Sequence, residues 1–112
     1  MCRNKYVILA KCYDKKKRLL SSAFNDYNKS SPIMKHFAVL AGLPEKEYWH
    51  SEVLALVRCK DKVPHRITVE RYNQDGTQAL CKPCPVCRLA IETYGVKLLE
   101  YTSTIGWVKE II

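Results

Sequence analysis

The 112-residue sequence contains no apolar run close to the roughly 20 residues that a membrane-spanning helix requires. The apolar stretch near its start is too short for the core of a signal peptide, and no small-residue cleavage site follows it. It also contains no internal repeat, linker or low-complexity segment. We therefore expect one cytoplasmic domain over residues 1–112, with no membrane partner.

Hydrophobic periodicity predicts five strands and three helices. The strands are expected at residues 6–13, 19–24, 66–72, 96–101 and 107–112. The helices are expected at residues 32–42, at 50–59, and from 83 or 84 to 94, while the turn-forming residues 25–31 predict a loop. The short link at 102–106 favours an antiparallel pairing of the last two strands. This order predicts an α/β fold with a mixed five-stranded sheet and helices packed against it.

Basic charge is concentrated in the first third of the chain. The formal net charge is +8, and residues 1–36 carry nine Lys or Arg against Asp14 and Asp26. Such an excess suits a polyanion, for example single-stranded nucleic acid, or a phosphorylated ligand. A simpler interpretation is that the charge only aids solubility.

The six cysteines could indicate disulfide bonds, but three of them are crowded together as Cys81, Cys84 and Cys87. In a reducing compartment, closely spaced cysteines bind metal more often than they form bridges. The other three are expected to be small buried residues, namely Cys2, Cys12 and Cys59.

Two short motifs predict a metal centre. His50-Ser51-Glu52 stands at the start of the second predicted helix, and Pro83-Cys84-Pro-Val-Cys87 at the start of the third. One imidazole and two thiolates supply three zinc ligands, and a fourth tetrahedral position remains open, as in catalytic zinc sites. Cys84 and Cys87 are three residues apart, so they share one face of a helical turn.

Glu52 lies two residues beyond the histidine ligand, beside the expected metal. There it could take a proton from water that the metal activates and deliver it to a substrate, as a general acid and base. Alternatively, Glu52 is a solvated carboxylate in the first turn of a helix. Cys81 could also complete a closed structural site of three cysteines and one histidine, with no open position.

The motifs H-x-E and P-C-x-x-C resemble the signature of the zinc-dependent cytidine and deoxycytidylate deaminase superfamily. The order of elements agrees with that resemblance from Tyr6 onward, and the chain is most similar to small single-domain deaminases of bacteria and their viruses. The resemblance implies a three-layer α/β sandwich, a Zn²⁺ cofactor and hydrolysis of a nucleobase amine, with Glu52 as the catalytic residue. It also implies oligomerisation and three substrate-binding residues, which are Asn25, Ser51 and Pro83. Tyr101 ends the fourth predicted strand near the expected pocket mouth, where it could bind the substrate by stacking on a base; alternatively, it is a core or rim residue of that strand.

The substrate remains open between two classes. The terminal hairpin resembles the branch that deaminates free cytidine, which favours cytidine, deoxycytidine or the monophosphate dCMP. The basic first third favours single-stranded DNA or RNA, with cytosine or adenine as the base. From a different class, the chain could be a zinc-stabilised nucleic-acid-binding module without turnover. An alanine at position 52 would leave such a module functional.

Overall fold

The computed structural model describes residues 7–43, 48–73 and 75–112, so Cys2 and Tyr6 lie outside the described residues. In chain order the elements are β1 (Val7–Tyr13), β2 (Leu19–Phe24), β3 (Asp26–Ser30), α1 (Pro32–Leu40), β4 (Tyr48–Trp49), α2 (Ser51–Arg58), β5 (Arg66–Tyr72), α3 (Pro85–Thr93), β6 (Leu98–Ser103) and β7 (Gly106–Ile111). The predicted fold class is confirmed: a mixed five-stranded sheet is combined with three helices.

The main sheet has the strand order β2-β1-β5-β6-β7. β1 is antiparallel to both β2 and β5, whereas β5 and β6 are parallel and are joined through α3. β6 and β7 form the expected antiparallel hairpin, in register from Leu98 opposite Ile111 to Ser103 opposite Gly106. Gly106 adopts φ = 122°, a conformation that residues with a side chain rarely adopt, and this explains the glycine at the turn.

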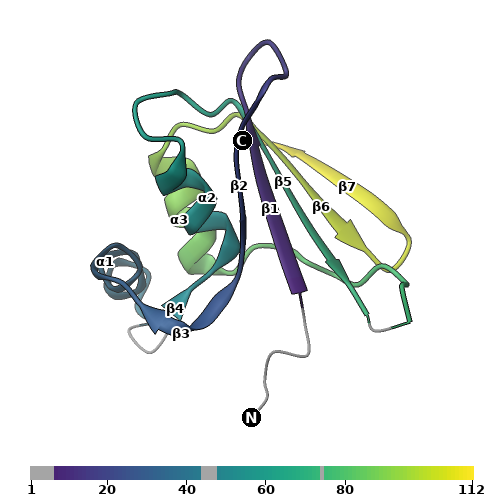
Figure 1. Cartoon of the computed structure of the whole chain (residues 1–112), viewed down its shortest axis with the longest axis horizontal. Helices are drawn as coiled ribbons and strands as arrows, with labels where there is room; N and C mark the ends of the chain where they lie inside the picture. Colours follow the sequence, from purple (N-terminus) through teal and green to yellow (C-terminus); the bar gives the residue numbers. More distant parts are fainter. Residues whose placement is uncertain (1–6, 44–47, 74) are drawn as a thin grey trace.

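All three helices lie on one side of the main sheet (Figure 1). Residues of β1 and β5 that face them are fully buried, including Ala10, Cys12 and Val69. The opposite face carries no helix within the described ranges. We call this uncovered side the open face of the sheet. The buried state expected for Cys12 and Cys59 is confirmed.

The segment predicted as a loop at residues 25–31 contains a strand instead. Asp26–Ser30 forms β3, which pairs antiparallel with β4 in a second, two-stranded sheet. Its turn-forming residues have low intrinsic strand propensity, and pairing with a segment about 20 residues later overrides it. This small sheet places Trp49 opposite Asp26 and directs the chain into His50.

The helices begin where local chemistry predicts. Ser31 is the N-cap of α1, its hydroxyl accepts a bond from the amide of Met34 at 3.0 Å, and Pro32 occupies the first turn. The buried side of α1 carries Met34, Phe37 and Ala38. None of the helices in the described ranges is long and apolar enough to cross a membrane.

Candidate metal centre and active site

His50 and Cys84 are placed at the starts of two neighbouring helices. His50 is the N-cap of α2, between β4 and the first helical residue, Ser51. Cys84 is the N-cap of α3, and Cys87 follows within the first turn of that helix. Both N-cap residues have extended backbone conformations, and neither side chain caps its own helix. Since α2 and α3 pack against each other, their N-termini bring the two motifs together.

The three predicted ligands form one cluster. The Nδ1 atom of His50 lies 3.2 Å from the Sγ atom of Cys87 and 3.6 Å from that of Cys84. The ligand atoms of the three residues all lie within 4.8 Å of one another, a spacing at which they could hold a metal ion. One imidazole nitrogen and two thiol sulfurs are a donor set that fits zinc.

Cys81 does not belong to this cluster, although the sequence left open that it could complete a closed structural site. Its side chain is buried, and its backbone amide donates to the carbonyl oxygen of Thr102 at 2.9 Å. Burial and the nearby Glu52 carboxylate raise the pKa of the Cys81 thiol to about 12. The cluster therefore has three protein ligands, the number that leaves a coordination position open in catalytic zinc sites.

The two cysteines of the cluster differ in protonation. The hydrogen bond from Cys87, with a further bond from His50, lowers the pKa of Cys84 to about 3. The pKa of Cys87 is raised well above its ordinary value, mainly by the bond to Cys84 and by burial. Of the two cysteines, Cys84 therefore favours the thiolate more strongly, and a thiolate is the form of cysteine that binds metal.

Glu52 is buried beside the cluster. Its carboxyl oxygen Oε1 accepts a hydrogen bond from the hydroxyl of Ser51 at 3.0 Å. Burial is the largest influence on Glu52 and raises its pKa, while the charge of His50 acts in the opposite direction. A carboxyl group with a raised pKa holds a proton more readily than an exposed one, which suits a general acid and base. The interpretation of Glu52 as a solvated carboxylate does not agree with its burial, since only 6% of its surface is exposed.

A cavity of about 200 Å³ opens beside Glu52 and the cluster. Its lining residues are Ile8, His50, Glu52, Arg71, Leu80, Cys81, Lys82 and Cys84. Sequence reasoning missed the two cations of this lining, Arg71 and Lys82. The sequence pattern could have indicated Arg71. It follows the buried Ile67 and Val69 at intervals of two residues, so it is a charged residue on the helix-facing side of β5.

The substrate-binding residues implied by the resemblance lie at different places. Ser51 and Pro83 are both buried next to the ligands His50 and Cys84. The side-chain oxygen of Asn25 accepts a bond from the amide of Ile8 at 3.0 Å, which places it against a residue of the cavity.

Tyr101 is not brought to the cavity. Its ring belongs to the buried core, and its hydroxyl donates to Glu110 at 2.9 Å. Its position on β6 faces the helices, as do the neighbouring core positions of the sheet.

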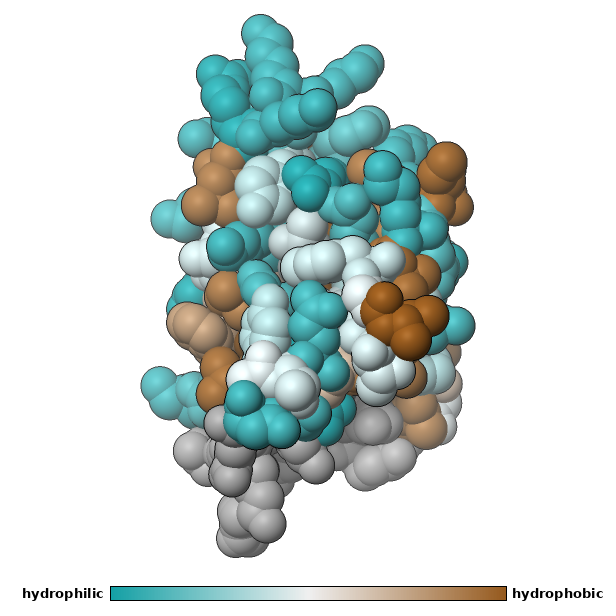
Figure 2. All heavy atoms as spheres, turned by 90° about the vertical axis from the view of Figure 1, so that its right-hand side faces the viewer, coloured by the Kyte–Doolittle hydropathy of each residue, from teal (hydrophilic) through white to brown (hydrophobic). Residues whose placement is uncertain are grey.

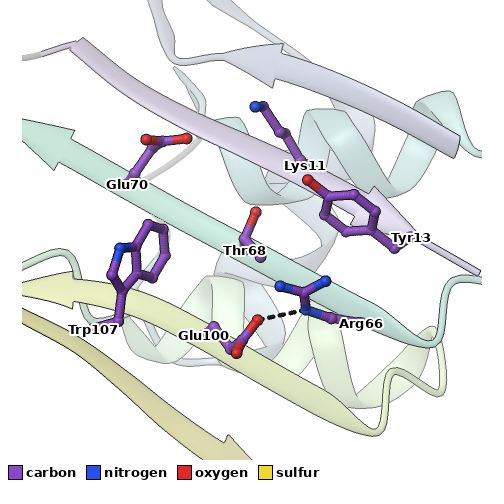
Figure 3. Close-up of a pocket in the computed structure, with 7 residues that line it drawn as sticks. All are labelled: Lys11, Tyr13, Arg66, Thr68, Glu70, Glu100 and Trp107. Carbon is purple, nitrogen blue, oxygen red and sulfur yellow. Dashed lines mark hydrogen bonds and ion pairs between the residues drawn. The ribbon is translucent and has the colours of Figure 1, made fainter. Parts of the chain in front are cut away.

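A larger hollow, about 370 Å³, lies on the open face of the sheet (Figure 3). Its lining residues are Lys11, Tyr13, Arg66, Thr68, Glu70, Glu100 and Trp107. It contains no histidine or cysteine, and two of its charged groups, Arg66 and Glu100, pair with each other. Arg66 also lies 4.8 Å from the ring centre of Tyr13. This hollow is larger than the cavity beside Glu52, but of the two only the smaller cavity is lined by residues of the His-Cys-Cys cluster.

Comparison with known proteins finds no family model that matches the chain and no curated protein that is significantly similar to it.

Proposed function

We propose that this chain is a zinc-dependent hydrolytic deaminase of a nucleobase, with cytosine in a nucleoside or nucleotide as its preferred substrate. The observation that carries the proposal is the position of Glu52: a buried carboxyl group lies at a small cavity that also contains a three-ligand His-Cys-Cys cluster. A purely structural metal site gives no reason to bury a carboxyl group there, because taking a carboxyl group out of water is costly.

In this proposal His50, Cys84 and Cys87 hold Zn²⁺. A zinc ion acts as a Lewis acid and lowers the pKa of water, which supplies a nucleophile near neutral pH. The reaction consumes one water, forms a C–O bond at the amine-bearing ring carbon and breaks the C–N bond, so that ammonia leaves. Glu52 accepts a proton from the attacking water, delivers it to the ring nitrogen, and then transfers the second proton to the departing amine.

The size and lining of the cavity support a small planar substrate. Its volume of about 200 Å³ is below the roughly 300–1,000 Å³ typical of pockets for drug-sized ligands. Arg71 and Lys82 line the same cavity, and two cations there favour a substrate that carries a phosphate. The hydrogen bond from Ser51 orients Glu52 toward its proton-transfer role.

The test is ammonia release by the zinc-loaded protein, with Glu52→Gln as the variant. The panel contains cytidine, deoxycytidine, their monophosphates, adenosine, and single-stranded DNA and RNA. We expect turnover of a cytosine compound that falls by about 10²–10⁴-fold in the variant, the usual contribution of a general acid and base.

Zinc content and thermal melting of the Glu52→Gln variant serve as the control, since both should match the unchanged protein. Silence of the unchanged, zinc-loaded protein across the panel would contradict the proposal and favour the non-catalytic binding module.

A further inference from the structure

One end of the molecule carries most of its excess charge. Three connections meet there: the β1–β2 turn, the segment after α2 and the segment after α3 (Figure 1). We call this the basic end, and its basic residues are Lys15, Lys16, Lys17, Arg18, Lys60, Lys62 and Lys97. All seven are exposed, and the same connections contain only two acidic residues, Asp14 and Asp61. Hydrophilic side chains dominate this end in the space-filling view (Figure 2).

The connections are in contact with one another. The residues Asp14, Arg18 and Lys62 line one hollow of about 450 Å³, together with apolar neighbours. The amide of His65 donates to the carbonyl of Tyr13, and the amide of Lys97 donates to the carbonyl of His65. The basic side chains are therefore held on one surface by the fold, although they come from three separate segments.

One of the two acidic groups is already engaged in the turn. Asp14 accepts bonds from the amides of Lys16 and Arg18 at 2.9 and 2.8 Å, and from the guanidinium of Arg18 at 3.0 Å. These contacts lower the pKa of Asp14, so it stays ionised and shapes the hairpin turn. Its charge offsets that of Arg18, and the neighbouring lysines keep theirs.

Two lysines occupy backbone conformations that favour glycine or asparagine. Lys17 has φ = 67° and Lys60 has φ = 57°, and these are the only non-glycine residues of the described chain with positive φ. The left-handed conformation is unfavourable for a lysine side chain. Both lie at the basic end. Lysine is therefore found there at two positions where the backbone conformation favours glycine or asparagine.

A purely structural explanation accounts for only part of this pattern. Lys60 and Lys62 follow the C-terminus of α2, where the helix dipole favours cations. The lysines of the β1–β2 turn follow no helix, and that explanation does not apply to them.

The basic end is remote from the metal cluster. α2 and α3 both begin at the cluster, at His50 and Cys84, and both end at the basic end. The eight residues of α2 alone span about 12 Å at 1.5 Å per residue. A ligand that touches both places must therefore be longer than a single nucleotide.

We propose that the basic end binds the phosphate backbone of single-stranded nucleic acid, without reading its sequence. Exposed lysines from three segments supply a group of positive charges that suits phosphates, which position a strand but carry no sequence information. The inference does not rest on the proposed deaminase activity, because it concerns binding at a separate surface.

The experiment measures fluorescence anisotropy of a labelled oligothymidylate about 20 nucleotides long, titrated with the zinc-loaded full chain at several salt concentrations. This probe has no amine-bearing base, so turnover cannot affect the result. The variant Lys16→Gln/Lys17→Gly removes two charges of the basic end, and glycine suits the backbone of position 17. The matched control, Lys35→Gln/Lys109→Gln, removes two exposed charges elsewhere.

Each phosphate contact contributes about 0.7 to the slope of log affinity against log salt. We therefore expect the steepness of that slope to fall by about 1.4 in the basic-end variant, which loses two contacts. That corresponds to about 25-fold weaker binding at 0.1 M salt, if binding at 1 M is unchanged. The control and Glu52→Gln should bind as the unchanged protein does. Equal losses in the basic-end variant and the control would overturn the proposal, and so would absence of binding by the unchanged protein. Binding to vesicles of phosphatidylserine and phosphatidylcholine without oligonucleotide binding would overturn it in favour of a membrane surface.

Discussion

His50 and Cys84 occupy equivalent positions, since each is the N-cap residue of the helix that follows it and each directs its side chain to the other. The imidazole Nδ1 of His50 lies 3.6 Å from the sulfur of Cys84, and neither side chain caps its own helix. Serine, threonine, aspartate and asparagine are the usual N-cap residues, and they satisfy an amide of the first turn. Two helix starts therefore lack the side-chain cap that α1 has in Ser31.

This arrangement predicts that replacing His50 by a capping residue stabilises the protein when no metal is bound. We expect His50→Ser to raise the free energy of unfolding by about 0.5–1 kcal/mol without metal, because serine can cap α2. The same variant should lose metal binding. Urea denaturation of both proteins in the presence of a chelator measures the difference. A lower stability of the variant would show that the imidazole contacts outweigh the cap.

The cluster predicts which cysteines bind zinc. Cys84→Ala and Cys87→Ala should each lose stoichiometric zinc, whereas Cys81→Ala should retain it, because Cys81 lies outside the cluster. A chelator should lower the melting temperature of the unchanged protein, since zinc at 100 times its Kd adds about 2.7 kcal/mol of stability. Atomic absorption and thermal melting give the two readings. Loss of zinc from Cys81→Ala, with the fold intact, would argue for a four-ligand structural site.

The cations of the cavity predict a preference for phosphorylated substrates. Lys82 is exposed at the rim, so Lys82→Gln should leave the fold intact. We expect the KM for dCMP to rise about tenfold, which corresponds to about 1.4 kcal/mol, while the KM for deoxycytidine changes little. Steady-state kinetics with both substrates test this. An equal effect on both would place Lys82 at the base or sugar instead.

The side chain of Glu110 predicts acid sensitivity of the fold. It accepts bonds from the hydroxyl of Tyr101 at 2.9 Å and from Arg88 at 2.8 Å, and these contacts lower its pKa below the ordinary value of 4.5. Because the folded-state pKa is lowered, the stabilisation is present above pH 4.5 and is lost as the pH falls through the folded value.

Glu110→Gln should therefore lower the free energy of unfolding by about 1 kcal/mol near pH 7, a modest value because the side chain is partly exposed. The difference should shrink below pH 4.5. Urea denaturation at both pH values measures it, and a difference that does not depend on pH would contradict the assigned role of the carboxylate.

The sequence predicted most elements because their signals are local. The alternation of residues 66–72 matches β5, and Pro32 after Ser31 marks the start of α1 as expected. The third helix begins at Pro85, slightly later than predicted, because Cys84 takes the extended N-cap conformation. β3 was missed because its pairing with β4 depends on a contact between distant segments, which no local pattern records.

The His-Cys-Cys cluster was predictable and the cavity was not. His50, Cys84 and Cys87 belong to motifs with fixed spacing, so a single sequence reveals them. Arg71 and Lys82 lie on segments that meet these motifs only after β5 and α3 have packed. Tyr101 was expected either at the pocket mouth or in the core of its strand, and the structure places it in the helix-facing core, where its hydroxyl bonds to Glu110.

The pairing of β1 with β5 has a consequence for the order in which the chain becomes structured. Tyr13 pairs with Arg66, so the centre of the sheet joins residues more than 50 positions apart. During synthesis, β1 and β2 can form a hairpin early, but the central pairing must wait until β5 has left the ribosome. Such long-range contacts slow folding. Cys84 and Cys87 are synthesised later still, so complete assembly of the His-Cys-Cys cluster is a late event, and metal capture would report a chain that has nearly finished folding.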